Sequence, residues 1–144
     1  MDIREFEELI QKAKTDNPKM FDLDSDNKPS IEYIKSVEKY YGIVFPASYN
    51  DFLLRHGGGY FAYTVVYSLD EQSPFYVLNK VAIEFVKTNN FFPVIDFETG
   101  DVAGFKIDNC VCEDSIILYD HEKKVVRDLK MGFYDSLVKF GLKS

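Results

Sequence analysis

Apolar side chains recur every three or four residues in several stretches of the chain, the spacing of one face of an α-helix. This pattern predicts helices over residues 3–13, 31–41 and 46–56, a further helix around Val81 and Phe85 that ends near residue 88, and a short final helix from Phe133. Ser30 is a candidate N-cap of the second stretch, and Gly42 follows it as a candidate C-cap. Helices therefore dominate the first half.

A second pattern begins at residue 60, where short β-branched and aromatic runs alternate with turn residues. The runs predict strands over residues 60–67, 91–97, 102–107, 115–119 and 125–129, and the segments 15–29 and 70–74 are predicted to be loops. Short turns between consecutive strands imply antiparallel hairpins. Helices, then a meander, then a helix predict an α+β fold with a mostly antiparallel, twisted β-sheet against which the helices pack.

Composition limits the classes of partner. The 144 residues are enough for one domain spanning 1–144, with a core that needs neither a disulfide nor a metal. The chain has 24 Asp and Glu against 17 Lys and Arg, a net charge of −7. Because phosphates and anionic lipids attract basic surfaces, we expect neither nucleic acid nor a membrane as partner, whereas a basic protein fits the charge. No signal-peptide or membrane-spanning pattern is present, so we expect a cytoplasmic protein.

Two short motifs suggest ligand binding and then depart from the required pattern. Residues 22–26 place Asp at alternate positions like a calcium loop, but Asn27 stands where such a loop needs glycine and Tyr33 where it needs glutamate. Three consecutive glycines, 57–59, follow a helix, whereas phosphate-binding glycines precede one. We interpret the first as a solvated acidic loop and the second as a helix C-cap with a chain reversal.

The cysteines and histidines give no catalytic or metal-binding spacing. Cys110 and Cys112 on one strand would point to the same face, too close together for an easy disulfide. His56 is expected to stabilise the C-terminus of a helix, where the partial negative charge of the helix dipole attracts it. His121 is expected to be an exposed turn residue. We therefore expect that the protein is not an enzyme and has neither a cofactor nor a metal site. The alternative is a small hydrolase that uses His56 or His121.

Tyrosines cluster in the predicted strand 60–67, at Tyr60, Tyr63 and Tyr67. This strand is apolar on both sides. Two interpretations stay open: one side faces a groove or a partner, where Tyr is enriched, or both sides are covered in the core.

The order of these signals resembles the SUKH superfamily of bacterial toxin-immunity proteins and fungal cell-wall-synthesis regulators. The resemblance covers about residues 30–141. Its first half is a helix, a glycine, a proline, an aromatic helix and a glycine turn, carried here by Ile34, Glu38, Gly42, Pro46, Tyr49, Phe52, Leu53, Gly57 and Gly58. Its second half is an aromatic strand, a Gly-Asp turn, an acidic-His turn and a Phe-bearing helix, carried here by residues 92–97, Gly100, Asp101, residues 119–122, Phe133 and Leu137. The chain departs from the family in having no Trp beside the glycine turn, and in having His56 where relatives often have Asn.

The resemblance implies a SUKH-like fold and a binding function: an immunity protein (antitoxin) that neutralises a cognate toxin domain, often a nuclease and hence basic, by direct contact. The alternative is a regulatory interaction module with a signalling or cell-wall-related partner. The family-motif residues Glu38, Gly42, Pro46, Gly57, Gly58 and Gly100 are read as structural; Glu38 is expected to bond polar groups near the following turn, and Asp101 to cap the Gly100 turn.

The partner-binding residues are predicted to be the acids of the turns in the meander. They are Asp96, Glu98, Asp101, Asp108, Glu113, Asp114, Asp120 and Glu122. An acidic surface would steer a basic toxin domain into contact. Ordinary solvated loop charges are the alternative interpretation for each of them.

Overall fold

A six-stranded antiparallel sheet forms the centre of the protein, as seen in a computed structural model that describes residues 1–143. The strands are β1 (Gly59–Phe61), β2 (Thr64–Val66), β3 (Phe91–Asp96), β4 (Val102–Asp108), β5 (Val111–Asp120) and β6 (Val125–Asp128), and the sheet order follows the chain order. The helices are α1 (Ile3–Asp16), the 3-10 helix η1 (Pro18–Phe21), α2 (Ile31–Tyr41), α3 (Ala47–His56), α4 (Val77–Lys80), α5 (Ile83–Asn89) and α6 (Phe133–Phe140). The sheet is open and the helices pack against it, so the predicted α+β fold is confirmed.

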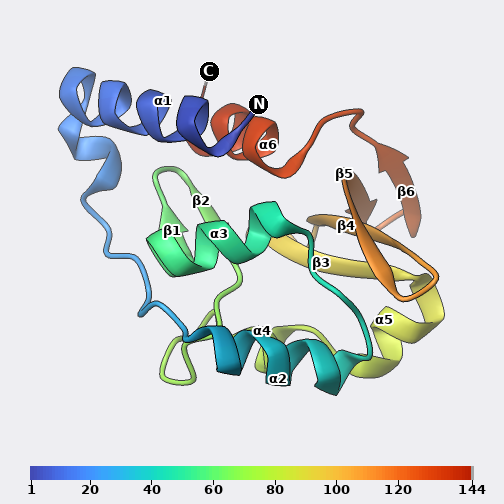
Figure 1. Ribbon diagram of the computed structural model, residues 1–144. Coiled ribbons are helices and arrows are strands. Elements are labelled where there is room, and N and C mark those ends of the chain that lie inside the picture. Colours follow the sequence, from blue (N-terminus) through green and yellow to red (C-terminus); the bar gives the residue numbers. More distant parts are fainter. Residues whose placement is uncertain (144) are drawn as a thin grey trace.

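Helices α1 and α6 lie on one side of the molecule and α2 and α4 on the other, with α3 between them. Figure 1 shows α1 and α6 side by side with both termini near them. The Met1 amino group lies 4.0 Å from the Asp135 carboxylate in α6. Among the described residues, no helix is long and apolar enough to cross a bilayer.

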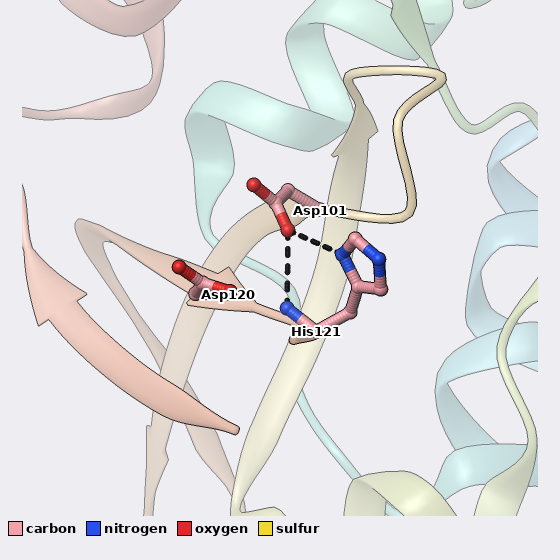
Figure 2. A group of neighbouring side chains, drawn as sticks. All are labelled: Asp101, Asp120 and His121. Carbon is pink, nitrogen blue, oxygen red and sulfur yellow. Dashed lines mark hydrogen bonds and ion pairs between the residues drawn. The ribbon is translucent and has the colours of Figure 1, made fainter. Parts of the chain in front are cut away.

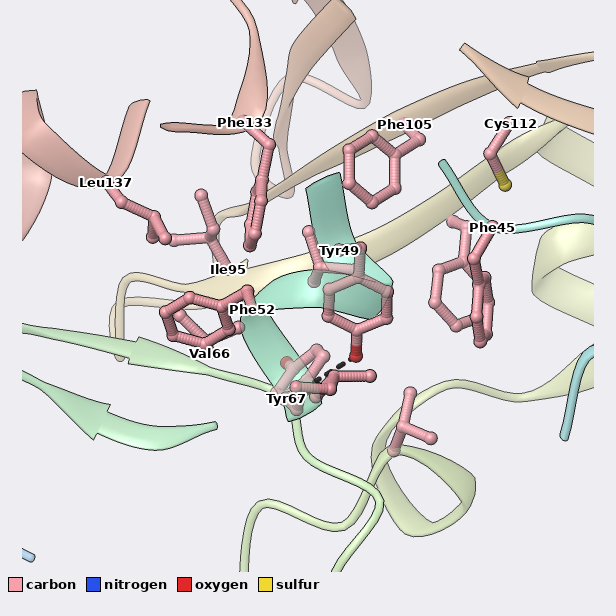
Figure 3. Packing of buried hydrophobic residues seen from close by; sticks show 14 of the residues in the cluster. Phe45, Tyr49, Phe52, Val66, Tyr67, Ile95, Phe105, Cys112, Phe133 and Leu137 are labelled. Atoms are coloured by element: carbon pink, nitrogen blue, oxygen red, sulfur yellow. Dashed lines mark hydrogen bonds between the residues drawn. The ribbon is translucent and has the colours of Figure 1, made fainter. Parts of the chain in front are cut away.

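The core is organised around the ring of Tyr49 in α3 (Figure 3). Its ring makes edge contacts with Phe45 and Phe133, at centroid distances of 5.2 and 5.7 Å. Its hydroxyl donates to the Tyr67 carbonyl oxygen over 2.7 Å, so the one polar atom of this buried side chain is satisfied. The aromatic helix predicted at 46–56 therefore packs directly on the sheet.

The predicted caps of α2 are present. The Ser30 hydroxyl accepts a bond from the Tyr33 N–H over 3.1 Å, and Gly42 takes the left-handed conformation, with φ 69°. Pro46 is predicted in the first turn of the next helix, but it stands at the N-cap of α3 with an extended backbone, one residue before the observed first turn. The helix predicted at 3–13 continues to Asp16, and the loop predicted at 15–29 contains η1.

The single strand predicted at 60–67 is wrong, because the chain folds back there as a hairpin. Phe61 pairs with Thr64 across a two-residue turn of Ala62 and Tyr63, and Ala62 has φ 52°. This turn contains none of the Gly, Asn or Pro residues that usually mark one. The apolar residues of β1 and β2 on either side of the turn therefore read as one continuous strand in the sequence.

The helix predicted around Val81 and Phe85 is in fact two short helices, α4 and α5. Val81 ends the first with an extended backbone, and its carbonyl oxygen accepts a bond from the Tyr41 hydroxyl over 2.8 Å. A tertiary partner thus takes the carbonyl that a continuous helix would have used.

Cys110 and Cys112 do not lie on one strand, so the arrangement in which their thiols would point to the same face does not occur. Asn109 and Cys110 form the two-residue turn between β4 and β5, both with positive φ, and Asp108 pairs with Val111. Cys110 is exposed, whereas Cys112 lies buried in β5. Burial raises the pKa of the Cys112 thiol to about 12, with a smaller contribution from the nearby charge of Glu38.

Candidate functional site

Five of the predicted acidic residues gather at one end of the sheet. Because consecutive strands run in opposite directions, the turns β1–β2, β3–β4 and β5–β6 share one end, and the turn β4–β5 lies at the other. The shared end carries the carboxylates of Asp96, Glu98, Asp101, Asp120 and Glu122. We call these five residues the acidic end.

Asp101 and His121 join two of these turns, although they lie 20 residues apart in the chain (Figure 2). One Asp101 carboxylate oxygen, Oδ1, accepts the His121 backbone N–H over 3.0 Å and lies 2.6 Å from His121 Nδ1. Gly100 makes room for this contact, since a Cβ there would lie 2.7 Å from the imidazole ring. The prediction that Asp101 caps the Gly100 turn is therefore wrong: its carboxylate bonds to the neighbouring turn.

The contact changes the titration of both groups. The hydrogen bond from His121 lowers the pKa of the Asp101 carboxyl, and the bond to Asp101 raises the pKa of the His121 imidazole. His121 is exposed, as predicted, and its ring is held by Asp101 rather than free in the turn.

Two further carboxylates at the acidic end are anchored. Asp96 accepts the Glu98 N–H over 2.7 Å through one oxygen and the Tyr67 hydroxyl over 3.1 Å through the other. Asp120 accepts the N–H groups of Glu122 and Lys123. The Glu98 and Glu122 side chains are exposed and make no hydrogen bond or ion pair with any residue in 1–143, so they are available to a partner.

The other three predicted residues lie elsewhere, so the eight acids do not form one surface. Asp108 is at the β4–β5 turn, at the opposite end of the sheet. Glu113 and Asp114 follow that turn in β5, and the Asp114 carboxylate accepts the Phe133 N–H over 2.8 Å at the start of α6. Asp114 thus stabilises a helix N-terminus.

An apolar hollow of about 280 Å³ lies beside the acidic end, on the face of the sheet away from Tyr49. Its floor is made by strand residues Pro93, Val102 and Tyr119, and one wall by Val81 and Phe85 of the α4–α5 segment. Val102 and Tyr119 are paired across β4 and β5 and are half-buried. Gly100, next to Asp101, also borders the hollow, so an apolar centre adjoins an acidic rim.

Sequence reasoning missed the hollow, although a signal for it exists. Val102 and Gly104 in β4, and Ile117 and Tyr119 in β5, alternate with the core residues of their strands. Apolar residues on both faces of two strands indicate that something covers the second face. The α4–α5 segment covers only part of it, with Phe85 making an edge contact on Tyr119 at 5.6 Å.

The acidic end also brings possible cation ligands together. Asp101, Asp120 and His121 each offer one ligand atom, and these atoms lie within 4.8 Å of one another. Both carboxylates of this group already accept hydrogen bonds: Asp101 from His121, and Asp120 from the backbone N–H groups of Glu122 and Lys123. The Asp101–His121 contact connects the β3–β4 turn to the β5–β6 turn.

The family-motif residues Glu38, Gly57 and Gly58 have structural roles in the turns that follow α2 and α3. The Glu38 carboxylate accepts the Phe45 N–H over 2.7 Å, beyond the Gly42 turn, as predicted. Gly57 and Gly58 have positive φ, and a Cβ on Gly57 would lie 2.1 Å from the Asp26 carbonyl oxygen. The glycine turn therefore needs both the conformation and the space that glycine provides.

His56 pairs with α1, and the tyrosine cluster is dispersed. His56 Nε2 lies 2.8 Å from the Glu7 carboxylate, and within residues 1–143 neither imidazole is hydrogen-bonded to a Ser, Thr or Cys side chain. Tyr63 is exposed at a hairpin turn, Tyr67 is buried with its hydroxyl on Asp96, and Tyr60 packs against Phe75.

A family model described as SMI1-KNR4 cell-wall (SUKH_6) matches residues 31–137, more than half of the chain. The protein belongs to the SUKH superfamily. This superfamily includes toxin-immunity proteins and SMI1/KNR4 regulators, and its members are protein-interaction modules. Searches of curated proteins and of solved structures gave no match.

The SUKH match extends from α2 into α6 and so includes every strand, the acidic end and the hollow. Helix α1 lies outside it, yet Phe6 and Ile10 of α1 are fully buried in the core. The surface described above thus belongs to the SUKH part of the chain.

Proposed function

We propose that this protein is an immunity protein that binds and neutralises a cognate bacterial toxin domain, a basic nuclease domain made by the same cell. The observation that carries the proposal is the acidic end beside an apolar hollow, on a SUKH fold. Protein interfaces commonly combine an apolar centre with a polar rim, and complementary charge raises the association rate.

The exposed carboxylates supply the attraction in this proposal, and the anchored ones supply rigidity. Glu98 and Glu122 reach into solvent, whereas Asp96 and Asp101 are held by hydrogen bonds to neighbouring elements. A preorganised acidic rim loses little side-chain freedom when it meets a partner. The hollow then accepts an apolar side chain of the toxin domain.

The proposed mechanism is binding alone, in the cytoplasm, without a catalytic step or a cofactor. A nuclease domain attracts phosphates with basic residues, and an acidic surface bound over them excludes the substrate. The net charge of −7 is consistent with such competition.

The direct test is co-expression with the C-terminal domain of a toxin encoded beside this gene. We expect the protein to protect cells from that domain and to co-purify with it. Failure to protect, together with no binding at micromolar concentration in vitro, would overturn the proposal.

A matched pair of variants locates the interface. Glu98→Lys combined with Glu122→Lys reverses two charges at the acidic end, and Asp108→Lys combined with Glu113→Lys reverses two exposed charges elsewhere. Both change the net charge equally. We expect the first to weaken binding by at least tenfold and the second to leave it nearly unchanged; equal effects would remove the acidic end from the interface.

The description of the matching family favours one second candidate, a regulatory interaction module with a signalling or cell-wall-related partner. A gene with no toxin beside it would favour this role. A growth assay discriminates the two: deletion of a regulator alters the cell envelope without any toxin, whereas deletion of an immunity protein is harmful only when its toxin is made.

A further inference from the structure

A second cavity, of about 180 Å³, lies between the end of α1, the chain that follows it, α3 and β1. Its apolar lining comes from Ile10, Leu23 and the rings of Phe21, Phe52 and Phe61. The Phe61 ring meets Phe21 and Phe52 edge-on, at centroid distances of 5.8 and 5.3 Å. Aromatic rings from three elements around a small cavity suit a ligand with an apolar or aromatic group.

Two opposite charges line this cavity without pairing. They are the Lys14 ammonium and the Asp24 carboxylate, and neither forms an ion pair with any residue in 1–143. Their charged atoms are therefore more than 4.0 Å apart. The Ser25 and Tyr60 hydroxyls also line the cavity and make no hydrogen bond within the same residues. Two separated charges with a net charge of zero complement a ligand that carries one charge of each sign.

The fold sets the positions of both charges. Next to Ser25, the Asp26 N–H donates to the Gly58 carbonyl oxygen over 2.8 Å, and the Asp26 carboxylate accepts the Ser73 hydroxyl over 2.6 Å. The Lys14 ammonium, in the last turn of α1, lies 5.2 Å from the centroid of the Phe21 ring, a cation–π distance. A ligand therefore meets charges that are already placed, which lowers the entropy cost of binding.

His56 supplies a further polar group to the lining. Its Nε2 lies 2.8 Å from the Glu7 carboxylate, and its ring packs against Phe52 and Phe61 at 5.2 and 5.9 Å. The other ring nitrogen, Nδ1, has no hydrogen-bond partner in the part of the chain that the structure describes. The ring is thus held rigidly and keeps one nitrogen for a ligand.

We propose that this cavity binds a free α-amino acid with an aromatic side chain, its carboxylate on Lys14 and its ammonium on Asp24. Such a zwitterion carries the two charges that the cavity leaves unpaired, and its ring joins the aromatic lining. A simple anion would leave Asp24 unpaired, and a simple cation would leave Lys14 unpaired. The volume of about 180 Å³ is below the roughly 300–1,000 Å³ of sites for drug-sized ligands, so the ligand is a small molecule and not a peptide.

The amino-acid site is separate from the proposed toxin-binding surface. None of the acidic-end residues lines it. Lys14, Asp24 and Ser25 also precede the residues that the SUKH model matches. The proposal therefore does not rest on the immunity function, and the purified protein alone is enough to test it.

Isothermal titration calorimetry with related probes tests the two charge contacts. We expect L-phenylalanine to bind, and to raise the midpoint of thermal unfolding as its concentration increases, because a ligand of the folded state stabilises that state. Phenylalaninamide lacks the carboxylate and N-acetylphenylalanine lacks the ammonium group. Each should bind roughly tenfold or more weakly than L-phenylalanine.

Two variants assign the charges to their partners. Lys14→Met should abolish the preference for L-phenylalanine over phenylalaninamide and keep the preference over N-acetylphenylalanine, and Asp24→Asn should do the reverse. Lys12→Met and Asp22→Asn are matched controls outside the cavity lining and should bind L-phenylalanine like the wild type. All four side chains are exposed, and circular dichroism verifies that the variants fold.

Two results would overturn the proposal. If neither L-phenylalanine nor L-tyrosine binds at millimolar concentration, the cavity holds water only. If L-phenylalanine and its two blocked derivatives bind equally well, the charges take no part in recognition. Neither result would alter the expected binding of a toxin domain at the acidic end.

Discussion

Asp101 and His121 show how one hydrogen-bonded pair organises the acidic end. The pair connects the β3–β4 turn to the β5–β6 turn, and each partner shifts the other's pKa. The His121 contribution to stability is fully present below its ordinary pKa of 6.5 and is lost as the pH rises through its raised value. The Asp101 contribution is present above its ordinary pKa of 3.8 and is lost as the pH falls through its lowered value.

A titration of His121 followed by NMR tests this pair. We expect its pKa to lie above 6.5 in the wild type and to fall back towards that value in Asp101→Asn, which removes the carboxylate charge. Asp108→Asn, at the far end of the sheet, should leave the titration unchanged. A His121 pKa that is insensitive to Asp101→Asn would contradict the contact.

Two glycines with positive φ differ in the space around them. A Cβ on Gly57 would collide with the Asp26 carbonyl oxygen, whereas a Cβ on Gly42 would have nothing within 4 Å. We expect Gly57→Ala to lower the free energy of unfolding by about 2–4 kcal/mol, from backbone strain and the clash together. Gly42→Ala should cost only the strain, about 1–2 kcal/mol.

Urea denaturation of both glycine variants measures the difference. Similar losses for the two would mean that the segment around Asp26 moves away freely and does not pack tightly on the glycine turn.

At the scale of elements, α1 stabilises a fold whose family match begins after it. The Phe6 ring is fully buried and stacks on Tyr134 of α6 at a centroid distance of 4.5 Å. His56 adds a hydrogen bond with Glu7 of α1. Helix α1 is therefore part of the core and not an appendage.

Phe6→Ala tests the role of α1. Removing this buried ring should lower the free energy of unfolding by about 3–5 kcal/mol, through lost burial and the cavity left behind. Glu8→Ala on the exposed side of the same helix is the control and should change it by about 0.5 kcal/mol or less. A small effect of Phe6→Ala in denaturant unfolding would show that α1 detaches without disturbing the core.

The elements also show where sequence patterns fail. Helix α2 was predicted with its observed bounds because its periodicity and both caps are local features. The β1–β2 hairpin was missed because its turn uses Ala62 and Tyr63, and the break at Val81 was missed because Tyr41 is a distant partner. Local rules carry no information about such contacts.

At the scale of the whole molecule, the distribution of charge makes a testable prediction about the rate of association with a partner. If a basic toxin domain docks at the acidic end, its association rate constant should fall steeply as salt is raised, because exposed charges are screened within roughly 10 Å at 0.1 M salt. The variant with Glu98→Lys and Glu122→Lys should associate more slowly and show a weaker salt dependence in stopped-flow mixing. An unchanged salt dependence would mean that steering arises elsewhere on the surface.

The sequence by itself determined the α+β class, most strand positions, the caps of α2 and the acidic balance, because these depend on periodicity, on local hydrogen bonds and on composition. The tertiary structure decided which charges act together. Strand direction brought Asp96, Glu98, Asp101, Asp120 and Glu122 to one end and sent Asp108 to the other. The apolar residues of the second sheet face are visible in the sequence, but only the tertiary structure decided that the α4–α5 segment covers this face in part and that, within residues 1–143, β6 has a free edge.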